Sequence, residues 1–180
     1  MSALPLIFIR CCRDAMHILA LTSACISILG AFMVITRRVA VHAVLYLVVT
    51  LLALACVLAL LGAPFAAALE VIIYAGAIMV LFVFVIMMLN LGKPDRDRET
   101  EWLRPRAWVG PAALASILGM ELLFGLRTLS GTGITFQITP REVGLSLFGP
   151  YVLMVELASF LLLTGLVTAF HIGRHWPGEH

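Results

Sequence analysis

Three glutamates lie inside long apolar stretches of this sequence: Glu70, Glu121 and Glu156. Placing an ionisable group in the middle of a bilayer costs about 3 kcal/mol or more. A carboxyl group in such a position is therefore a candidate for binding or passing protons. The alternative is a protonated carboxyl that makes one hydrogen bond to a neighbouring helix and has no chemical role. The surroundings of the three residues differ, and they favour different interpretations.

Glu70 stands about a third of the way along the apolar run 65–90, and Tyr74 follows it four residues later. On a helix this spacing places the carboxyl and the phenol on one face. A phenol both donates and accepts hydrogen bonds, so the pair suits a proton path through water. The competing interpretation is an interhelical hydrogen bond that only orders the helix.

Three small residues follow directly: Ala75, Gly76 and Ala77. Glycine is about 1 kcal/mol less favourable than alanine in a helix interior, so this tripeptide is a weak point. It allows a neighbouring helix to approach closely, which is the commoner use of glycine in membranes. It also offers little steric resistance to a π-bulge, a distortion often found at functional sites.

Glu156 and Glu121 lead to opposite expectations. Glu156 lies nine residues past Leu147, with Ser159 on the same helix face. At 1.5 Å per residue, Glu156 would lie about 13 Å into its helix, near the bilayer midplane. We therefore expect it to have a functional role or to face a polar interface. Glu121 lies six residues before Arg127, near a helix end. We interpret it as a group that reaches the membrane surface without a chemical role.

The composition is that of an integral membrane protein. Of the 180 residues, 62% are hydrophobic and 12% are charged, whereas soluble domains have about 45–50% and 25%. No polar stretch reaches the roughly 50 residues that a soluble domain needs. The net charge of +2 gives no reason to expect nucleic-acid binding. No zinc, phosphate-loop or dinucleotide motif is present in the sequence.

The pattern predicts an all-α fold, with residues 1–180 forming a single membrane domain of five transmembrane helices. Each run approaches or exceeds the roughly 20 residues needed to cross a bilayer; they are 16–36, 40–61, 65–90, 107–127 and 147–171. A tight turn is expected at 61–64, a polar cytoplasmic loop at 91–106 and an external loop at 128–146. Because proline suits the first turn of a helix, Pro150 predicts a helix start there, with a kink as the alternative.

The Lys/Arg distribution predicts the orientation, because cytoplasmic loops carry an excess of these residues. One side would hold eight: Arg37, Arg38, Lys93, Arg96, Arg98, Arg104, Arg106 and Arg174. The other would hold four: Arg10, Arg13, Arg127 and Arg141. The N-terminus is therefore expected outside and the C-terminus in the cytoplasm. Trp102 and Trp108 flank the fourth helix start, where an interfacial aromatic belt is expected.

The cysteines and histidines do not suggest a metal centre. The four cysteines lack the spacing of a metal site or a disulfide framework, and we interpret them as small apolar or surface residues: Cys11, Cys12, Cys25 and Cys56. His42 and His171 lie near expected helix ends and are interpreted as solvated groups. Neither has a second histidine three or four residues away. A bis-histidine haem or metal site is therefore not expected.

Three segments carry a resemblance to a known family: ALEVIIYAGAIMVLFVFVIMMLN, VHAVLYLVVTLLALACVLALLGAPFAAALE and LFGPYVLMVELASFLLLTGLV. Together they resemble subunit J of bacterial NADH:quinone oxidoreductase, respiratory complex I, over about residues 17–174. The resemblance implies a membrane subunit that helps couple quinone reduction to proton translocation. It implies membership of a translocase whose FMN, iron–sulfur clusters, NADH and quinone are bound by partner subunits, with no cofactor bound by this chain.

The resemblance also implies roles for particular residues. The third helix of subunit J carries a π-bulge in some states, and its rotation is thought to make or break a water wire toward the carboxylates of subunit K. Carried over, the proton path would use Glu70, Tyr74 and Glu156. The helix gate would comprise Tyr74, Ala75, Gly76, Ala77, Met79 and Phe82. Partners would be the bilayer and subunits resembling A, H and K, in the bacterial inner membrane.

Two other classes of function are weighed against this one. A self-contained transporter or channel needs a midplane site built from broken helices or inverted repeats. The five unequal runs show no obvious repeat, which counts against it. The other alternative is a structural assembly subunit with inert carboxyls. A weaker resemblance extends to subunits of cation antiporters and membrane-bound hydrogenases.

Overall fold

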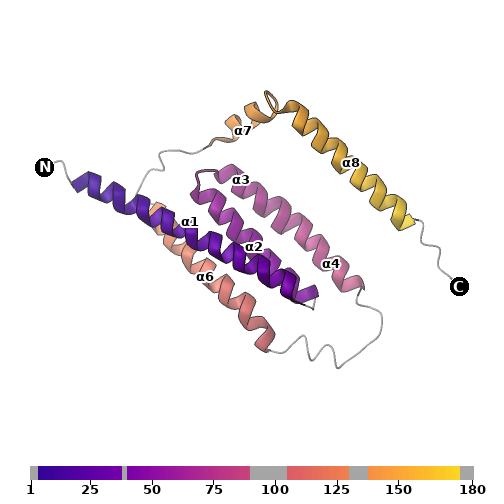
Figure 1. Ribbon diagram of the computed structural model, residues 1–180, viewed down its shortest axis with the longest axis horizontal. Helices are drawn as coiled ribbons and strands as arrows, with labels where there is room; N and C mark the ends of the chain where they lie inside the picture. Colours follow the sequence, from indigo (N-terminus) through magenta and orange to yellow (C-terminus); the bar gives the residue numbers. More distant parts are fainter. Residues whose placement is uncertain (1–3, 38–39, 90–104, 130–137, 175–180) are drawn as a thin grey trace. The chain divides into compact units, whose positions relative to one another are not determined.

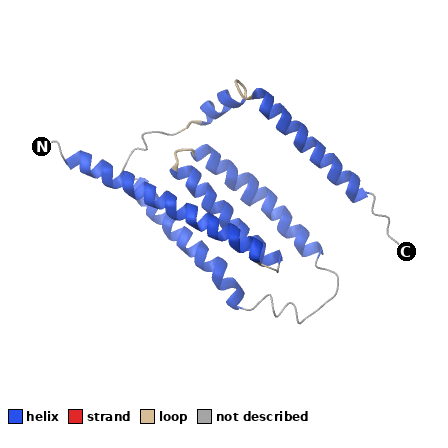
Figure 2. Ribbon diagram, in the orientation of Figure 1, coloured by secondary structure: helices blue, strands red, loops and turns tan. Residues whose placement is uncertain are grey.

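A computed structural model describes residues 4–37, 40–89, 105–129 and 138–174 of the chain. Helices make up nearly all of this described part, which contains no strand (Figure 2). Five of its helical segments are long and apolar enough to cross a membrane. The predicted all-α fold with five transmembrane helices is therefore confirmed. The described residues divide into two compact units, 1–137 and 138–180, each considered by itself.

The first unit is a bundle whose spanning segments run in alternating directions (Figure 1). Helix α2 is its centre, because it contacts α1, α6 and all three parts of the third segment. The elements are α1 (Leu4–Thr36), α2 (Ala40–Leu60), α3 (Pro64–Leu69), the π-helix η1 (Glu70–Ile78), α4 (Met79–Leu89) and α6 (Pro105–Leu129). Helix α1 thus begins well before residue 16, where the apolar run starts.

The core of this bundle lies where α1, α2 and α6 meet. Buried apolar side chains from the three helices pack there: Ile26, Val49, Ala53 and Leu118. Partly buried side chains pack against this cluster: Leu52, Cys56 and Leu114. Gly30 on α1 lies directly against the Thr50 hydroxyl of α2, with no space for a Cβ atom. Such glycines let membrane helices approach closely, where packing rather than hydrophobic burial holds them together.

The expected turn at 61–64 is a Schellman cap. The Gly62 amide donates to the Ala59 carbonyl at 3.1 Å, and the Ala63 amide to that of Leu58 at 3.0 Å. This pattern requires a left-handed residue after the helix end, and Gly62 has a φ of 87°. Pro64 then opens α3. The turn therefore reverses the chain without any charged side chain.

The second unit differs from the sequence prediction. It comprises two helices, α7 (Pro140–Leu147) and α8 (Val152–Arg174), separated by a turn at 148–151. The prediction of a helix from 147 to 171 is therefore wrong at its start, because α8 begins at Val152. The prediction of a loop over all of 128–146 is also wrong, because α7 begins at Pro140. The residue before a proline is disfavoured in the α conformation, so Pro150 interrupts the helix at Gly149.

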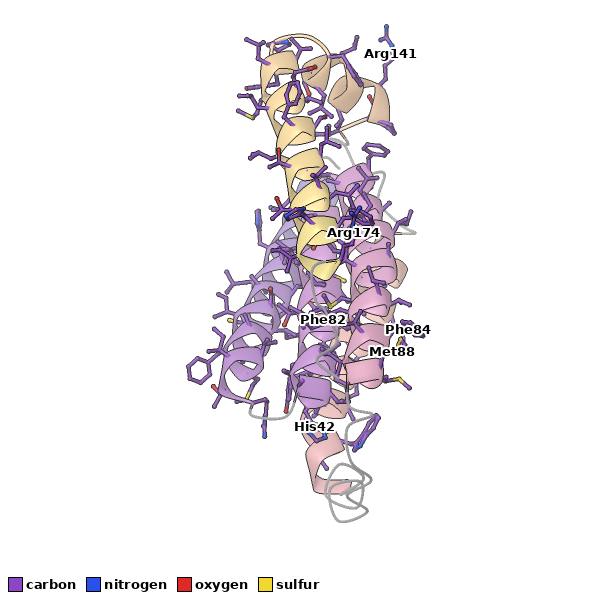
Figure 3. All side chains as sticks on the ribbon, turned by 90° about the vertical axis from the view of Figure 1, so that its right-hand side faces the viewer. His42, Phe82, Phe84, Met88, Arg141 and Arg174 are labelled. Carbon is purple, nitrogen blue, oxygen red and sulfur yellow. The ribbon has the colours of Figure 1, made fainter. Side chains whose placement is uncertain are left out.

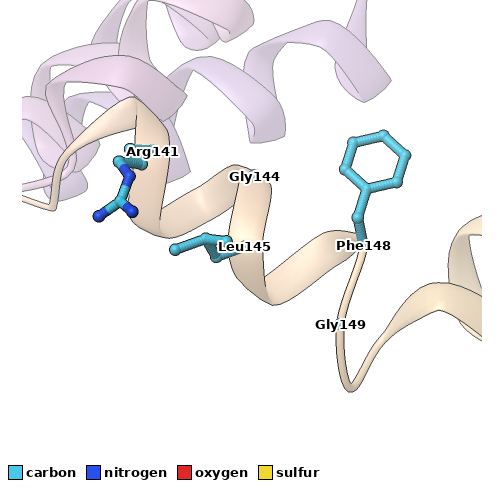
Figure 4. Close-up of a pocket in the computed structure, with 5 residues that line it drawn as sticks. All are labelled: Arg141, Gly144, Leu145, Phe148 and Gly149. Atoms are coloured by element: carbon cyan, nitrogen blue, oxygen red, sulfur yellow. The ribbon is translucent and has the colours of Figure 1, made fainter.

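Helix α7 has a sequence signal that the prediction overlooked. Its N-terminus carries a capping box: the Thr139 hydroxyl accepts from the Glu142 amide at 3.3 Å, and the Glu142 carboxylate accepts from the Thr139 amide at 2.8 Å. A surface cavity of about 450 Å³ lies on α7. Figure 4 shows that the Arg141 and Leu145 side chains, which line it, lie on the same side of the helix. The Phe148 ring points away from them.

Candidate functional site

The third spanning segment changes helix type in its middle. The stretch Glu70–Ile78 is π-helical for nine residues, between the α-helical α3 and α4. At its end the Met79 amide donates to the carbonyl of Tyr74, five residues earlier. π-helices are rare, and most are single-turn bulges. Tyr74, Ala75, Gly76 and Ala77 all lie within this stretch, so the distortion and the small tripeptide coincide.

Glu70 is the first residue of the π-helix and is partly buried, while Tyr74 is half exposed. Neither side chain makes a hydrogen bond within the described part of the chain. Both polar groups are therefore available to partners outside this chain or to water. The interhelical hydrogen bond considered from the sequence does not form between either group and the described helices.

Met79 and Phe82, the other residues of the expected gate, follow η1 on α4. The Met79 side chain is buried at 8% exposure, whereas that of Phe82 is 48% exposed. Figure 3 shows Phe84 and Met88 projecting from one edge of α4. The end of the π-stretch is thus held in the bundle by Met79, while the following helix is largely uncovered. A rotation beginning in η1 would change which of these side chains faces outward.

An apolar cavity of about 410 Å³ lies beside the π-helix, between α2, the third segment and α6. Aliphatic and small side chains line it, among them Val49, Leu52, Cys56, Ala67, Val71 and Leu118. Val71 belongs to η1. The cavity therefore leaves space beside one face of the π-stretch.

Glu156 lies shallower in its helix than the sequence suggested. Because α8 begins at Val152 rather than near Leu147, the carboxyl is in the second turn, about 6 Å from the helix start. The depth of Glu156 within its helix is therefore smaller than the sequence predicted. Its side chain is exposed, and the Ser159 hydroxyl donates at 3.0 Å to the Val155 carbonyl instead of to Glu156. Within the second unit this glutamate is unpartnered among the described residues.

Glu121 is the carboxyl that sequence reasoning placed wrongly. It turns toward α1, where the Thr22 and Ser23 hydroxyls donate to its Oε1 at 2.7 and 2.6 Å. The signal available in the sequence was the adjacent hydroxyl pair on the first helix. His42 is also buried, at 9% exposure, instead of being solvated. Within the described residues, no group of three or more His, Cys, Asp or Glu side chains is arranged to hold a metal ion.

These features define a multi-pass α-helical membrane protein with a π-helical spanning segment that carries a carboxyl group. Comparison with known families then gives its identity. Residues 30–172 match the family described as NADH-ubiquinone/plastoquinone oxidoreductase chain 6. The chain belongs to this family.

Curated bacterial relatives agree with this assignment. The chain is 56% identical to NADH-quinone oxidoreductase subunit J of Pseudomonas aeruginosa over 154 residues, covering 84% of this chain and 93% of the relative. It is 54% identical to the subunit J of Escherichia coli K12, covering 83% and 82%. The subunit J of Buchnera aphidicola from Schizaphis graminum is 48% identical, covering 83% and 92%. The resemblance to subunit J of complex I is thus confirmed, and other subunits of that complex are partners of this chain.

Proposed function

We propose that this chain helps couple quinone reduction to proton translocation, with the π-helical part of its third spanning segment acting as a gate. One observation carries the proposal: η1 is a nine-residue π-helix that begins at Glu70. A rare backbone state therefore occurs next to a carboxyl group in a membrane segment. Both the distortion and a carboxyl group within a membrane segment are costly, and both are typical of functional sites.

A π-to-α change provides a mechanism for gating. In η1 each amide bonds the fifth preceding carbonyl, whereas in an α-helix it bonds the fourth. With 3.6 residues per turn, absorbing one extra residue rotates the following helix by about 100°. Met79 would then leave its buried position, and Phe82 would face in a different direction. Such a rotation would open or close a water path that includes Glu70 and Tyr74.

The surroundings of η1 support a low-cost change. Every residue of the π-stretch is at least partly exposed. At Gly76 a Cβ atom would lie 3.2 Å from the Val71 carbonyl oxygen, a contact that glycine avoids. The adjoining cavity leaves space for Val71 to move. Contacts with partner subunits would then select between the two states, since the chain itself imposes few on this segment.

The remaining roles are assigned by the same proposal. Glu70, Tyr74 and Glu156 contribute to the proton path, and partner subunits resembling A, H and K surround the bundle. FMN, iron–sulfur clusters, NADH and quinone are bound by partner subunits, so this chain contributes to the translocase without a cofactor of its own. The N-terminus faces outward and the C-terminus faces the cytoplasm.

The test is Gly76→Leu in the assembled complex. A bulky side chain at the 3.2 Å contact with Val71 disfavours the π-state by about 1–3 kcal/mol, enough to shift a balanced equilibrium by roughly 5- to 150-fold. We expect slowed or uncoupled quinone reduction, with electron transfer from NADH to an artificial acceptor intact.

Gly165→Leu is the matched control, because Gly165 is an exposed residue of the spanning helix α8 and nothing lies within 4 Å of a Cβ atom there. Normal pumping and quinone reduction in Gly76→Leu would refute the gate. Loss of assembly in Gly76→Leu but not in Gly165→Leu would identify Gly76 as a packing contact instead.

A further inference from the structure

A second carboxyl site lies away from the π-helix, between α1 and α6. Glu121 Oε1 accepts hydrogen bonds from Thr22 Oγ1 at 2.7 Å and from Ser23 Oγ at 2.6 Å. Ser23 is completely buried. The other carboxyl oxygen, Oε2, is also buried and has no hydrogen-bond partner among the described residues. The two oxygens of one carboxyl group therefore have opposite environments.

This asymmetry matches a carboxylic acid better than a carboxylate. The carbonyl oxygen of an acid has two lone pairs and accepts two hydrogen bonds, as Oε1 does here. The lengths of the two hydrogen bonds to Oε1 are compatible with either protonation state. The environment of Oε2 therefore distinguishes the acid from the carboxylate. In a carboxylate Oε2 would carry part of a negative charge with no donor, which is costly in a buried position. In the acid Oε2 carries the proton and no net charge, so its lack of a partner costs less.

We propose that Glu121, with Thr22 and Ser23, forms a proton-binding site at the α1–α6 interface. The site holds one proton on Oε2, and its two hydroxyl donors join the helices through Oε1. Thr22 Oγ1 also lies 2.9 Å from the Leu19 carbonyl and has only one proton to share. Ser23 is therefore the principal donor.

The titratable neighbour of this site is on α2. Cys56 packs against the core cluster to which Ile26 of α1 and Leu118 of α6 belong, and both α1 and α2 pack against α6. In the described part of the chain, the hydrogen-bond partners of Glu121 are hydroxyl groups, not cations. With no cation to stabilise a carboxylate, the neutral acid is the form that this interface accommodates. The proposal does not depend on the gate in η1.

Infrared spectroscopy of the assembled complex at neutral pH tests the proposal directly. A protonated carboxyl has a C=O stretching band distinct from the bands of a carboxylate, and deuterium exchange shifts it. Glu121→Gln should remove intensity from the protonated-carboxyl band. Glu142→Gln is the matched control, because Glu142 is an exposed capping residue of α7, and it should remove intensity from the carboxylate bands.

Ser23→Ala gives an independent measurement that keeps the glutamate. Removing a donor to the carbonyl oxygen should move the Glu121 band to higher frequency. Loss of carboxylate intensity in Glu121→Gln, or an unmoved protonated-carboxyl band in Ser23→Ala, would overturn the proposal. The second result applies even where Glu121→Gln does not assemble.

Discussion

The phenol oxygen of Tyr46 on α2 lies directly against the backbone of Gly110 on α6, in space that even a Cβ atom would occupy. Tyr46 is 3% exposed, and Arg37 donates to its hydroxyl at 3.3 Å. The Arg37 guanidinium also stands 5.3 Å from the centre of the Tyr46 ring, within the range of a cation–π interaction. One side chain thus connects the end of α1 to the start of α6.

Gly110→Ala should weaken this contact. The added methyl overlaps the buried phenol, and overpacking of this kind typically costs about 1–3 kcal/mol. We expect a lower thermal stability of the complex, measured as loss of this subunit from the detergent-solubilised assembly on heating. Gly119→Ala, on the same helix with open space around it, should not lower the stability. Equal behaviour of the two variants would show that the Tyr46 contact is adaptable.

Gly62→Ala tests the turn between α2 and α3. Its φ of 87° is a left-handed conformation that costs an L-residue about 1–2 kcal/mol. The variant should therefore lower the stability of the complex. Gly125→Ala provides the contrast, because helical geometry and open space favour alanine by about 1 kcal/mol. A stabilising effect of Gly62→Ala would contradict the Schellman cap.

Glu70→Gln and Glu156→Gln test the proton path. Each variant keeps the size and hydrogen-bonding capacity of the side chain but removes its titratable proton. Since both carboxyls lack partners among the described residues, we expect assembly to be preserved and proton pumping or coupled quinone reduction to fall. Pumping in inverted membrane vesicles measures this. Full activity of both variants would support a structural role for the carboxyls.

Reporter fusions test the orientation. The excess of Lys and Arg on one side predicts that a fusion after residue 100 reads as cytoplasmic and a fusion near residue 135 reads as external. An alkaline phosphatase and green fluorescent protein pair reports the two locations with opposite signals. The reversed pattern would refute the orientation, and equal signals at both positions would refute the spans between them.

Local sequence was enough to predict the membrane class, the five spans and the position of the weak point at Gly76. Apolar length decides whether a helix can cross a bilayer, and Gly62 with Pro64 marks a turn by backbone geometry alone. The same local chemistry marks α7 through Thr139 and Glu142, although its short length hid it within an expected loop. These features depend on neighbours within one helical turn, which a sequence displays directly.

Glu121 shows what the sequence alone did not decide. Its distance from a helix end suggested a group that reaches the membrane surface, but the packing of α6 against α1 directs it to Thr22 and Ser23, about a hundred residues away in the sequence. The contact between Tyr46 and Gly110 likewise depends on how α2 and α6 cross. Apolar patterning fixes which segments enter the membrane, whereas the rotation and register of each helix against its neighbours follow from side-chain packing, which only the tertiary structure determines.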